Sequence, residues 1–334
     1  RCFISLAVEQ KADDTRPNRG ITPLPNLETK LVAANTLTPL HRKGNVLLVT
    51  QELRGEQAKL RNANRAFFAA ANGADKRRVQ KQILELRHKI ADLVKQDGIF
   101  SGDEAALLAH WDPFDPNSFA PFFDAEWMFG LEPSATEGWF DIALANPPYV
   151  RQEKIETFQI NGKPVVSKKQ LKADYKTYAG TADLLVYFYE RALRLLKPEG
   201  ALAFITSNKW YRAGYGKGLR SWLVENARIL KLMDFGDAQV FEAIAYPTIF
   251  VATRRAAPGK PLDSETFDAM NWEMGVPVET FPARFAAEAF AMPQKDLAAA
   301  GWQMEPQAER DLLAKLRASS KLLNDWCGGK LFYG

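Results

Sequence analysis

The sequence predicts an α/β protein with a mostly parallel, doubly wound sheet, because strand and helix patterns alternate in its second half. The apolar runs typical of buried strands lie at 140–145, 201–206, 229–235 and 248–253. Amphipathic helix patterns lie at 183–196 and 216–227. Strands joined by helical crossovers form parallel sheets, which bind ligands beyond the carboxyl ends of their strands. Polar residues directly after a strand are therefore the first candidates for a functional site.

The composition is that of a globular protein, and it limits the possible functions. The 334 residues are 46% hydrophobic and 25% charged, and no apolar run is long enough to cross a bilayer. Two cysteines and three scattered histidines offer neither a disulfide framework nor a metal-ligand spacing. We therefore expect no metal site and a reducing, cytoplasmic location. The net charge of +4 permits nucleic-acid binding without requiring it.

The first part of the chain is expected to contain a helical insertion, at about 45–110. Residues 1–12 resemble the middle of an amphipathic helix and lack an initiator Met, which suggests a fragment. A short buried strand is expected at 30–34, running into Asn35. Residues 50–96 contain no Pro, and Asn72-Gly73 predicts a break into two antiparallel helices. The spacing of apolar residues places one set on a single helix face: Val79, Ile83, Leu86, Ile90 and Leu93.

Two other segments are expected to be less regular. Residues 111–138 are rich in aromatic residues and Pro, so they are expected to cover a core without regular structure. A stacking platform for bases is the alternative interpretation of these aromatic residues. After residue 256 the pattern loosens, with one further helix at 305–318. We therefore expect a catalytic domain over 1–255, followed by a linker and the start of another domain over 256–334.

The tetrapeptide Asn146-Pro147-Pro148-Tyr149 carries the chemistry, because it directly follows the strand pattern at 140–145. Two consecutive prolines fix two φ angles and remove two backbone donors, which leaves a stiff loop with acceptor carbonyls. The Asn146 side-chain oxygen and the Pro147 carbonyl could accept both hydrogens of a planar exocyclic amine. Such a grip localises the nitrogen lone pair for attack on a sulfonium methyl group. Tyr149 could stack on the base, contributing ~1–3 kcal/mol.

With its flanking segments, this tetrapeptide resembles the amino-methyltransferase family, within the adenine-specific enzymes of type IIG restriction–modification systems. The segments that agree with the family in order are 182–188, 196–200, 205–210 and 240–249. The resemblance implies a Rossmann-like methyltransferase sheet, S-adenosylmethionine as cofactor, double-stranded DNA as partner and methylation of a flipped-out adenine at N6. It implies that Tyr149 and Phe241 stack on opposite faces of the base, with Tyr246 as the alternative to Phe241.

Further roles follow from the same resemblance. It implies contacts to the cofactor from Asn35, Asp183 and Phe188. The lysine-rich stretch after the tetrapeptide is expected to contact the DNA backbone, chiefly through Lys154, Lys168, Lys169 and Lys172. A merely solvated loop is the alternative for these lysines.

The sequence also departs from the family pattern. No strand followed by a Gly-x-Gly turn precedes Asn35, and an acidic residue for the cofactor ribose is missing with it. The glycines at 214, 216 and 218 do not replace that turn, because they lie between a late strand and a helix; we expect them near the base or the DNA. Residues 329–334 resemble the entrance to a target-recognition domain.

Two alternatives to a DNA adenine methyltransferase stay open at this stage. The same tetrapeptide serves in protein-glutamine and RNA N-methyltransferases, since a glutamine amide or a guanine amine can be held in the same way. A non-catalytic DNA-binding module with a methyltransferase-like fold is the second alternative, and the missing glycine-rich turn favours it. The DNA recognition sequence and the oligomeric state do not follow from the sequence.

Overall fold

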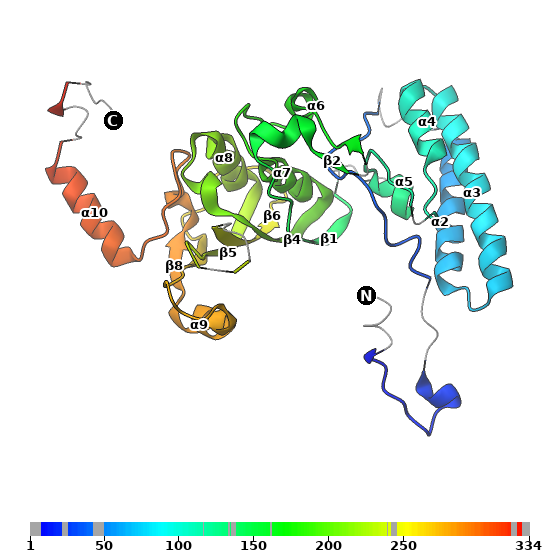
Figure 1. The fold of residues 1–334 in the computed structure, drawn as a ribbon, viewed down its shortest axis with the longest axis horizontal. Coiled ribbons are helices and arrows are strands. Elements are labelled where there is room, and N and C mark those ends of the chain that lie inside the picture. Colours follow the sequence, from blue (N-terminus) through cyan, green and yellow to red (C-terminus); the bar gives the residue numbers. More distant parts are fainter. Residues whose placement is uncertain are drawn as a thin grey trace. The chain divides into compact units, whose positions relative to one another are not determined.

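The chain divides between Ser134 and Ala135 into a helical unit (1–134) and a sheet unit (135–334), which are described separately (Figure 1). The computed structural model describes residues 8–21, 26–42, 50–115, 117–132, 134, 138–160, 162–238, 240–241, 246–321 and 326–328. Of the helix expected at 1–12, residues 1–7 lie outside the described residues, Val8 is helical, and residues 10–12 are not. The segment at 329–334 also lies outside the described residues. Among the described helices, none combines the length and the apolar character that a membrane crossing needs.

The helical unit is built on the expected hairpin. Its helices are α2 (Gln51–Ala69), α3 (Gly73–Gln96), α4 (Gly102–His110) and the short α5 (Ala125–Phe129), preceded by the 3-10 turn η1 (Pro17–Gly20). Asn72 ends the loop between α2 and α3, and its side chain accepts a hydrogen bond from the Asp75 N–H. A side-chain acceptor at this position satisfies one of the orphan N–H groups of a helix start. The break predicted at Asn72-Gly73 is therefore confirmed, with Asn72 as the N-cap.

Two details of the helical unit differ from the expectation. The strand expected at 30–34 is absent from the described residues; only Ala34 forms a single bridge, to Ala120. Leu31 is 56% exposed, so this segment has neither a ladder partner nor a buried side to hold it extended. On α3, Val94 is buried and Leu93 is only half-buried, because a straight helix turns slightly past a strict seven-residue repeat.

The sheet unit contains a six-stranded sheet in the order β1-β4-β6-β5-β7-β8. Its strands are β1 (Phe140–Ala145), β4 (Leu196–Ser207), β5 (Ala227–Asp234), β6 (Pro247–Arg254), β7 (Thr266–Asn271) and β8 (Phe290–Pro293). β1 pairs in parallel with β4, and β5 with β7, whereas β6 runs antiparallel to both of its neighbours and β8 is antiparallel to β7. Four of the six strands thus point the same way, and the expected mostly parallel α/β sheet is confirmed.

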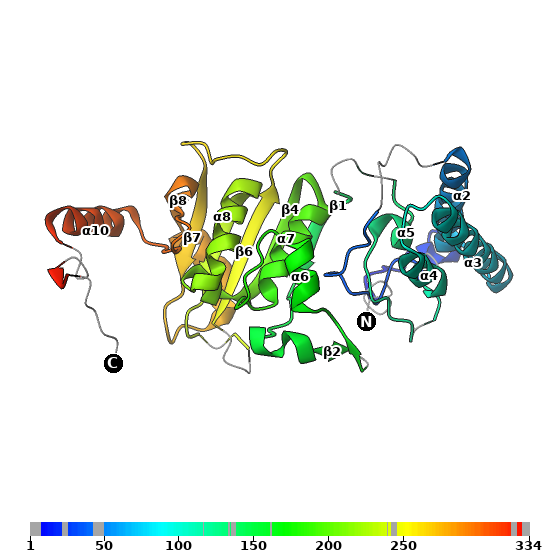
Figure 2. The same cartoon turned by 90° about the horizontal axis from the view of Figure 1, so that it is seen from above.

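Helices cover both faces of this sheet. α7 (Leu185–Leu195) and α8 (Lys217–Asn226) lie across one face, over β4 and its neighbours (Figure 2). On the other face, Phe285 of α9 (Phe281–Glu288) joins a buried cluster with Met233 of β5 and Met270 of β7. At the edge of the sheet, β1 leaves Ile142 and Leu144 exposed. The apolar runs of the sequence therefore become the strands of a sheet, one face of which is covered by α7 and α8.

The remaining elements of the sheet unit lie in its connections and after its last strand. The short strands β2 (Gln159–Ile160) and β3 (Lys163–Pro164) form a hairpin, and α6 (Lys168–Asp174) follows it. The 3-10 turns are η3 (Gln152–Thr157), η4 (Asn208–Tyr211), η5 (Gly214–Gly216), η6 (Val278–Thr280) and η7 (Gln294–Asp296), and the last helix is α10 (Gln307–Ser319). The sheet thus continues beyond residue 255 through β7 and β8. The functional division proposed at that residue stays a prediction.

Candidate functional site

Three connections of the sheet unit meet at one edge of the sheet, which is where the sequence places the site. β1 and β4 are parallel with Ala145 opposite Phe204, so the residues after both strands emerge at the same edge. β6 begins at this edge because it runs the other way, with Pro247 opposite Ser207. The residues after β1, the residues after β4 and the residues before β6 are therefore neighbours.

The diproline corner, residues 146–149, follows β1 at this edge, and main-chain hydrogen bonds hold the residues after it. Pro147 is buried, whereas Asn146, Pro148 and Tyr149 are exposed. The Pro148 carbonyl accepts a hydrogen bond from the Val150 N–H at 2.9 Å, and the Val150 carbonyl accepts one from the Leu184 N–H at 2.9 Å. The corner is thus pinned to the start of α7 by main-chain bonds.

Two polar groups of the corner have no partner within the described part of the protein. Among the described residues, neither the Asn146 side chain nor the Pro147 carbonyl has a hydrogen-bond partner. Because the two prolines restrict the backbone after Asn146, the loop itself loses little conformational freedom when a ligand binds. The corner therefore offers two adjacent acceptors in a fixed frame.

The two aromatic residues expected to hold a base lie against each other. The ring centroids of Tyr149 and Phe241 are 6.2 Å apart, with an interplanar angle of 61°. Tyr149 is 41% exposed, and its partial burial raises the pKa of its phenol above the ordinary value. A planar base between two parallel rings needs a centroid separation of roughly 7 Å, twice the van der Waals spacing of carbon atoms. One ring must therefore turn, and the gap must widen slightly, before a base enters.

Tyr246, the alternative to Phe241, has a different position. Its backbone has a φ of +47°, a left-handed conformation that non-glycine residues rarely adopt. The Asn208 N–H donates to the Tyr246 carbonyl at 2.8 Å, and the Lys209 ammonium lies 5.5 Å from the centre of the Tyr246 ring. The Asn208 side chain in turn donates to Asp234 at 2.7 Å. These contacts join the ends of β4, β5 and β6 beside the corner.

The residues expected to contact a cofactor differ in how their side chains are used. The Asp183 carboxylate accepts from the Gln152 N–H at 3.1 Å and from the Tyr215 hydroxyl at 3.2 Å, which ties the chain after the corner to α7 and η5. Phe188 is half-buried on α7, between the fully buried Tyr187 and Tyr189. Phe188 thus presents ring surface, whereas Asp183 has a positioning contact that the sequence did not reveal.

Asn35, the third of these residues, belongs to the helical unit. It is 5% exposed; its Nδ2 donates to the Thr38 hydroxyl at 2.8 Å, and its Oδ1 accepts from the Leu37 N–H at 3.2 Å. Its amide is thus engaged in its own turn. The role that the resemblance implies for Asn35 stays a prediction.

The lysines expected to contact DNA fall into two groups. Lys154, Lys169 and Lys172 are exposed, on η3 and α6. Lys168 instead donates to the Gln152 side chain at 2.8 Å and to the Gly180 carbonyl at 3.1 Å. Lys168 therefore holds the segment after the corner in place, while the other three point their charge to solvent.

An aromatic core behind the edge supports the residues after β4. Trp210 of η4 packs edge-on against Trp302 and contacts Tyr189 and Phe250, with ring centroids 5.0–6.3 Å apart. Gly216 allows α8 to begin beside this turn, because a Cβ there would lie 2.1 Å from the Trp210 carbonyl oxygen. The sequence placed Asn208 and Gly216 in segments near the site, but it did not indicate the hydrogen bond from Tyr215 to Asp183, the one from Asn208 to Asp234, or the close approach at Gly216.

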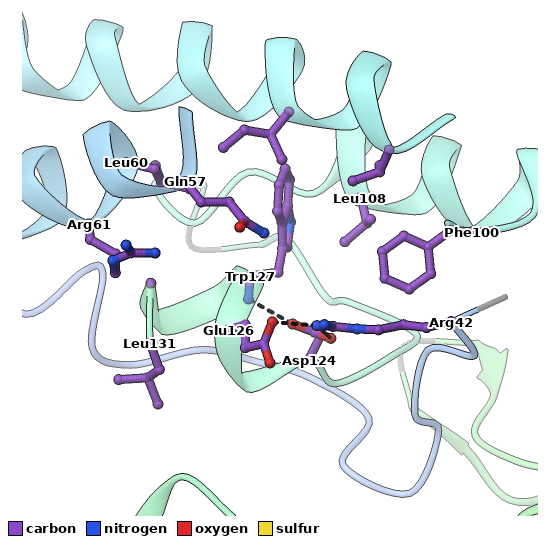
Figure 3. Close-up of a pocket in the computed structure, with 13 residues that line it drawn as sticks. Arg42, Gln57, Leu60, Arg61, Phe100, Leu108, Asp124, Glu126, Trp127 and Leu131 are labelled. Carbon is purple, nitrogen blue, oxygen red and sulfur yellow. Dashed lines mark hydrogen bonds and ion pairs between the residues drawn. The ribbon is translucent and has the colours of Figure 1, made fainter. Parts of the chain in front are cut away.

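A small cavity of about 30 Å³ in the helical unit is a separate feature. Helices α2, α3 and α4 and the 124–131 segment line it with mostly apolar side chains (Figure 3). Arg42 crosses it, with an Nη2 to Glu126 distance of 2.5 Å and an Nη2 to Asp124 distance of 3.5 Å. Burial raises the pKa of the Glu126 carboxyl despite this cation. None of the site residues expected from the sequence lines this cavity.

Comparison with known proteins gives a family and several relatives. The sequence model of the Eco57I restriction-modification methylase matches residues 45–241. The type II methyltransferase M.PaeR7I of Pseudomonas aeruginosa is 27% identical over 249 residues, which cover 71% of this chain and 38% of that protein. The type II methyltransferase M.XhoI of Xanthomonas vasicola is 38% identical over 117 residues, covering 34% of this chain and 20% of that protein.

A solved structure is similar as well: the methyltransferase subunit of a type I restriction-modification system from Streptococcus thermophilus. It is 14% identical with a TM-score of 0.35, over 62% of this chain and 43% of that one. The chain thus spans less than half the length of each of these proteins.

Proposed function

The chain belongs to the Eco57I restriction-modification methylase family, and we propose that its sheet unit methylates the N6 amine of adenine in double-stranded DNA. The matched residues include the diproline corner and extend to Phe241. One observation carries the proposal. The two acceptors at the corner, the Asn146 side chain and the Pro147 carbonyl, are the groups that the described residues leave unpaired.

Two fixed acceptors suit an exocyclic amine. The amine has two hydrogens, and in a planar base its lone pair is delocalised into the ring. Asn146 Oδ1 and the Pro147 carbonyl accept both hydrogens and favour a tetrahedral nitrogen, whose lone pair can attack an electrophilic carbon. Because positive charge grows on that nitrogen in the transition state, these contacts strengthen as the reaction proceeds. The methylated amine loses its surplus proton readily, so no general base is required.

Tyr149 and Phe241 are proposed to hold the extruded base. An adenine paired inside a duplex hides its amine, so the nucleotide must leave the stack at a cost of a few kcal/mol. The two rings, 6.2 Å apart, offer stacking on both faces of the base after a small opening. Each stacking contact contributes ~1–3 kcal/mol. Their combined contribution is of the size that extrusion requires.

S-adenosylmethionine is proposed as the methyl donor, and the residues present fit it in part. When bound, it supplies a methyl group activated by a sulfonium. Phe188 offers half-buried ring surface on α7 for the cofactor's adenine, and the neighbouring Asp183 carboxylate lies at the start of the same helix. Asn35 fits less well, because its amide is already paired with Leu37 and Thr38.

A methyl-transfer assay tests the proposed function. The protein is incubated with methyl-labelled S-adenosylmethionine and, in parallel, duplex DNA, RNA and protein substrates, and the labelled product is identified after hydrolysis. We expect N6-methyladenine from duplex DNA. N4-methylcytosine as the product would contradict the choice of base, and label in RNA or in protein glutamine alone would contradict the choice of substrate.

A further inference from the structure

A strip of positive charge lies beside the diproline corner, on the connection between β4 and α8. It consists of Lys209, Arg212 and Lys217, all exposed. Among the salt bridges between described residues, none involves these three side chains. In the lysine-rich stretch after the corner, Lys168 donates to Gln152 and Gly180, whereas Lys154, Lys169 and Lys172 are exposed as well.

The local fold puts Lys209 and Arg212 on the same side of the chain. Lys209 lies in the turn η4 and Arg212, three residues later, is its C-cap, whose N–H donates to the Lys209 carbonyl at 3.3 Å. Side chains at i and i+3 of a 3-10 turn point in the same direction. The two residues between them, Trp210 and Tyr211, are buried, so the cations face solvent.

Gly216 brings Lys217 next to this pair. Its backbone lies so close to the Trp210 carbonyl oxygen that a Cβ would be 2.1 Å away, which presses the start of α8 against η4. Lys217 is the first residue of α8, and the first turn of that helix carries no acidic residue. The strip is also fixed to the site, because the Lys209 ammonium lies 5.5 Å from the ring of Tyr246.

We propose that Lys209, Arg212 and Lys217 hold the phosphates of the DNA strand next to the extruded nucleotide. This inference rests on the proposed function; the sequence placed the 214–218 segment near the base or the DNA, and here the phosphate contact is assigned to three named side chains. Extruding a base draws its flanking phosphates toward the protein edge, where their repulsion must be screened. Three cations without a salt bridge to a described residue, at the edge where the base would enter, supply that screening. Their contacts with the phosphates release counterions condensed on the DNA.

The test is the salt dependence of DNA binding, measured by fluorescence anisotropy of a labelled duplex without a methyl donor. In the triple variant Lys209→Gln, Arg212→Gln, Lys217→Gln, the slope of log K against log salt should fall by about 2.7, at ~0.9 for each neutralised phosphate. Between about 50 and about 200 mM salt, the wild type should then lose roughly 40-fold more affinity than the variant.

Two matched variants accompany this measurement. Lys260→Gln, Lys315→Gln, Arg317→Gln removes the same charge from exposed positions elsewhere in the sheet unit and should leave the slope nearly unchanged. The charge-conserving variant Lys209→Arg, Arg212→Lys, Lys217→Arg should bind as the wild type does. An equal loss in the two glutamine variants would overturn the proposal, as would an unchanged slope or tighter binding of duplex RNA. Methyl transfer to another base with the slope effect intact would instead contradict only the proposed function.

Discussion

The turn at Asn35 and the corner at Asn146 use the same side chain in opposite ways. In the helical unit, Asn35 is 5% exposed and its amide both donates and accepts within four residues of chain. In the sheet unit, Asn146 is exposed, and no described residue pairs with its amide. Charged side chains of the two units show the same contrast. Arg42 of the helical unit forms ion pairs with two carboxylates, whereas Lys209 of the sheet unit faces no acid among the described residues.

This difference separates polar groups that hold the fold from polar groups that await a ligand. A buried amide with both partners contributes to stability, and its loss leaves a buried N–H unpaired. An exposed amide on a stiff loop adds little to stability, so its presence there needs another reason. Substitutions in the two regions should therefore affect different quantities: the free energy of unfolding in the helical unit and the rate of methyl transfer in the sheet unit.

The largest effect is expected for Asn146→Ala. Removing one of two fixed acceptors should lower kcat by about 10²–10³-fold, as loss of a transition-state hydrogen bond does elsewhere. Duplex binding should stay within about twofold, because the phosphate contacts are unchanged. The control Asn146→Asp keeps an acceptor oxygen and should retain part of the activity. Near wild-type turnover by the alanine variant would contradict the role of Asn146 as an acceptor for the amine, and with it the distinction drawn between Asn35 and Asn146.

Arg42→Met should mainly affect stability. It leaves the Glu126 carboxylate, 8% exposed, without its cation. Breaking a fully buried pair costs 3–5 kcal/mol, and because the Arg42 side chain is 28% exposed we expect about 2 kcal/mol. The measurement is urea unfolding followed by circular dichroism.

The pH dependence of this variant checks the cause. Burial already raises the pKa of Glu126, and removing Arg42 raises it further. A folded-state pKa above the unfolded one means that stability falls as the pH rises through it, so the loss should be smaller at about pH 5 than at about pH 7. Adding Glu126→Gln should restore part of the stability; a loss that is independent of pH would point to packing instead.

Asn35→Ala should lower the free energy of unfolding by about 1 kcal/mol, because the Leu37 N–H and the Thr38 hydroxyl lose their partner. The KM for S-adenosylmethionine, measured in parallel with Thr38→Val as the control, tests whether Asn35 acts on the fold alone or also on the cofactor. We expect it to stay within twofold of the wild-type value. A large rise with Asn35→Ala alone would support the cofactor contact implied by the resemblance.

The smallest effect is expected for Tyr149→Phe, which keeps the ring and removes the hydroxyl. Desolvation raises the pKa of Tyr149 above 10, so the phenol is neutral at ordinary pH and its ionisation contributes nothing. Activity should stay within about twofold, with a flat profile from about pH 7 to about pH 9. Tyr149→Ala, by contrast, should lose the ~1–3 kcal/mol of base stacking. A pH-dependent loss in the phenylalanine variant would assign the hydroxyl a role.

Much of the sheet unit could be predicted from the sequence. The strand patterns matched β1, β4, β5 and β6 within two residues at each end, apart from the start of β4, and the helix patterns matched α7 and α8. These elements have apolar faces with clear periodicity, and the chain returns to one core after each of them. The position of 146–149 at the carboxyl edge followed directly from that order.

The rest depended on partners that a single sequence does not reveal. The 30–34 segment has a strand-like composition, yet without a neighbouring strand it forms one bridge only. β7 and β8 were missed because short strands have weak patterns; the place of β7 is set by pairing with β5, and that of the edge strand β8 by pairing with β7. Likewise, Tyr215 and Asn208 join the site through hydrogen bonds to Asp183 and Asp234, which lie far from them in the chain.

The reversed direction of β6 has a consequence for how this scaffold can vary. Because β6 runs against its neighbours, β5 ends and β6 begins at the same edge of the sheet, with Asp234 opposite Thr248. Insertions or exchanges in this connection leave the pairing of β4, β5 and β6 intact. Exchanging only the part of the connection that carries Phe241, with the buried Phe235 kept, should therefore change the second aromatic residue of the proposed base site without disturbing the sheet. This makes the connection a point of entry for engineering substrate choice.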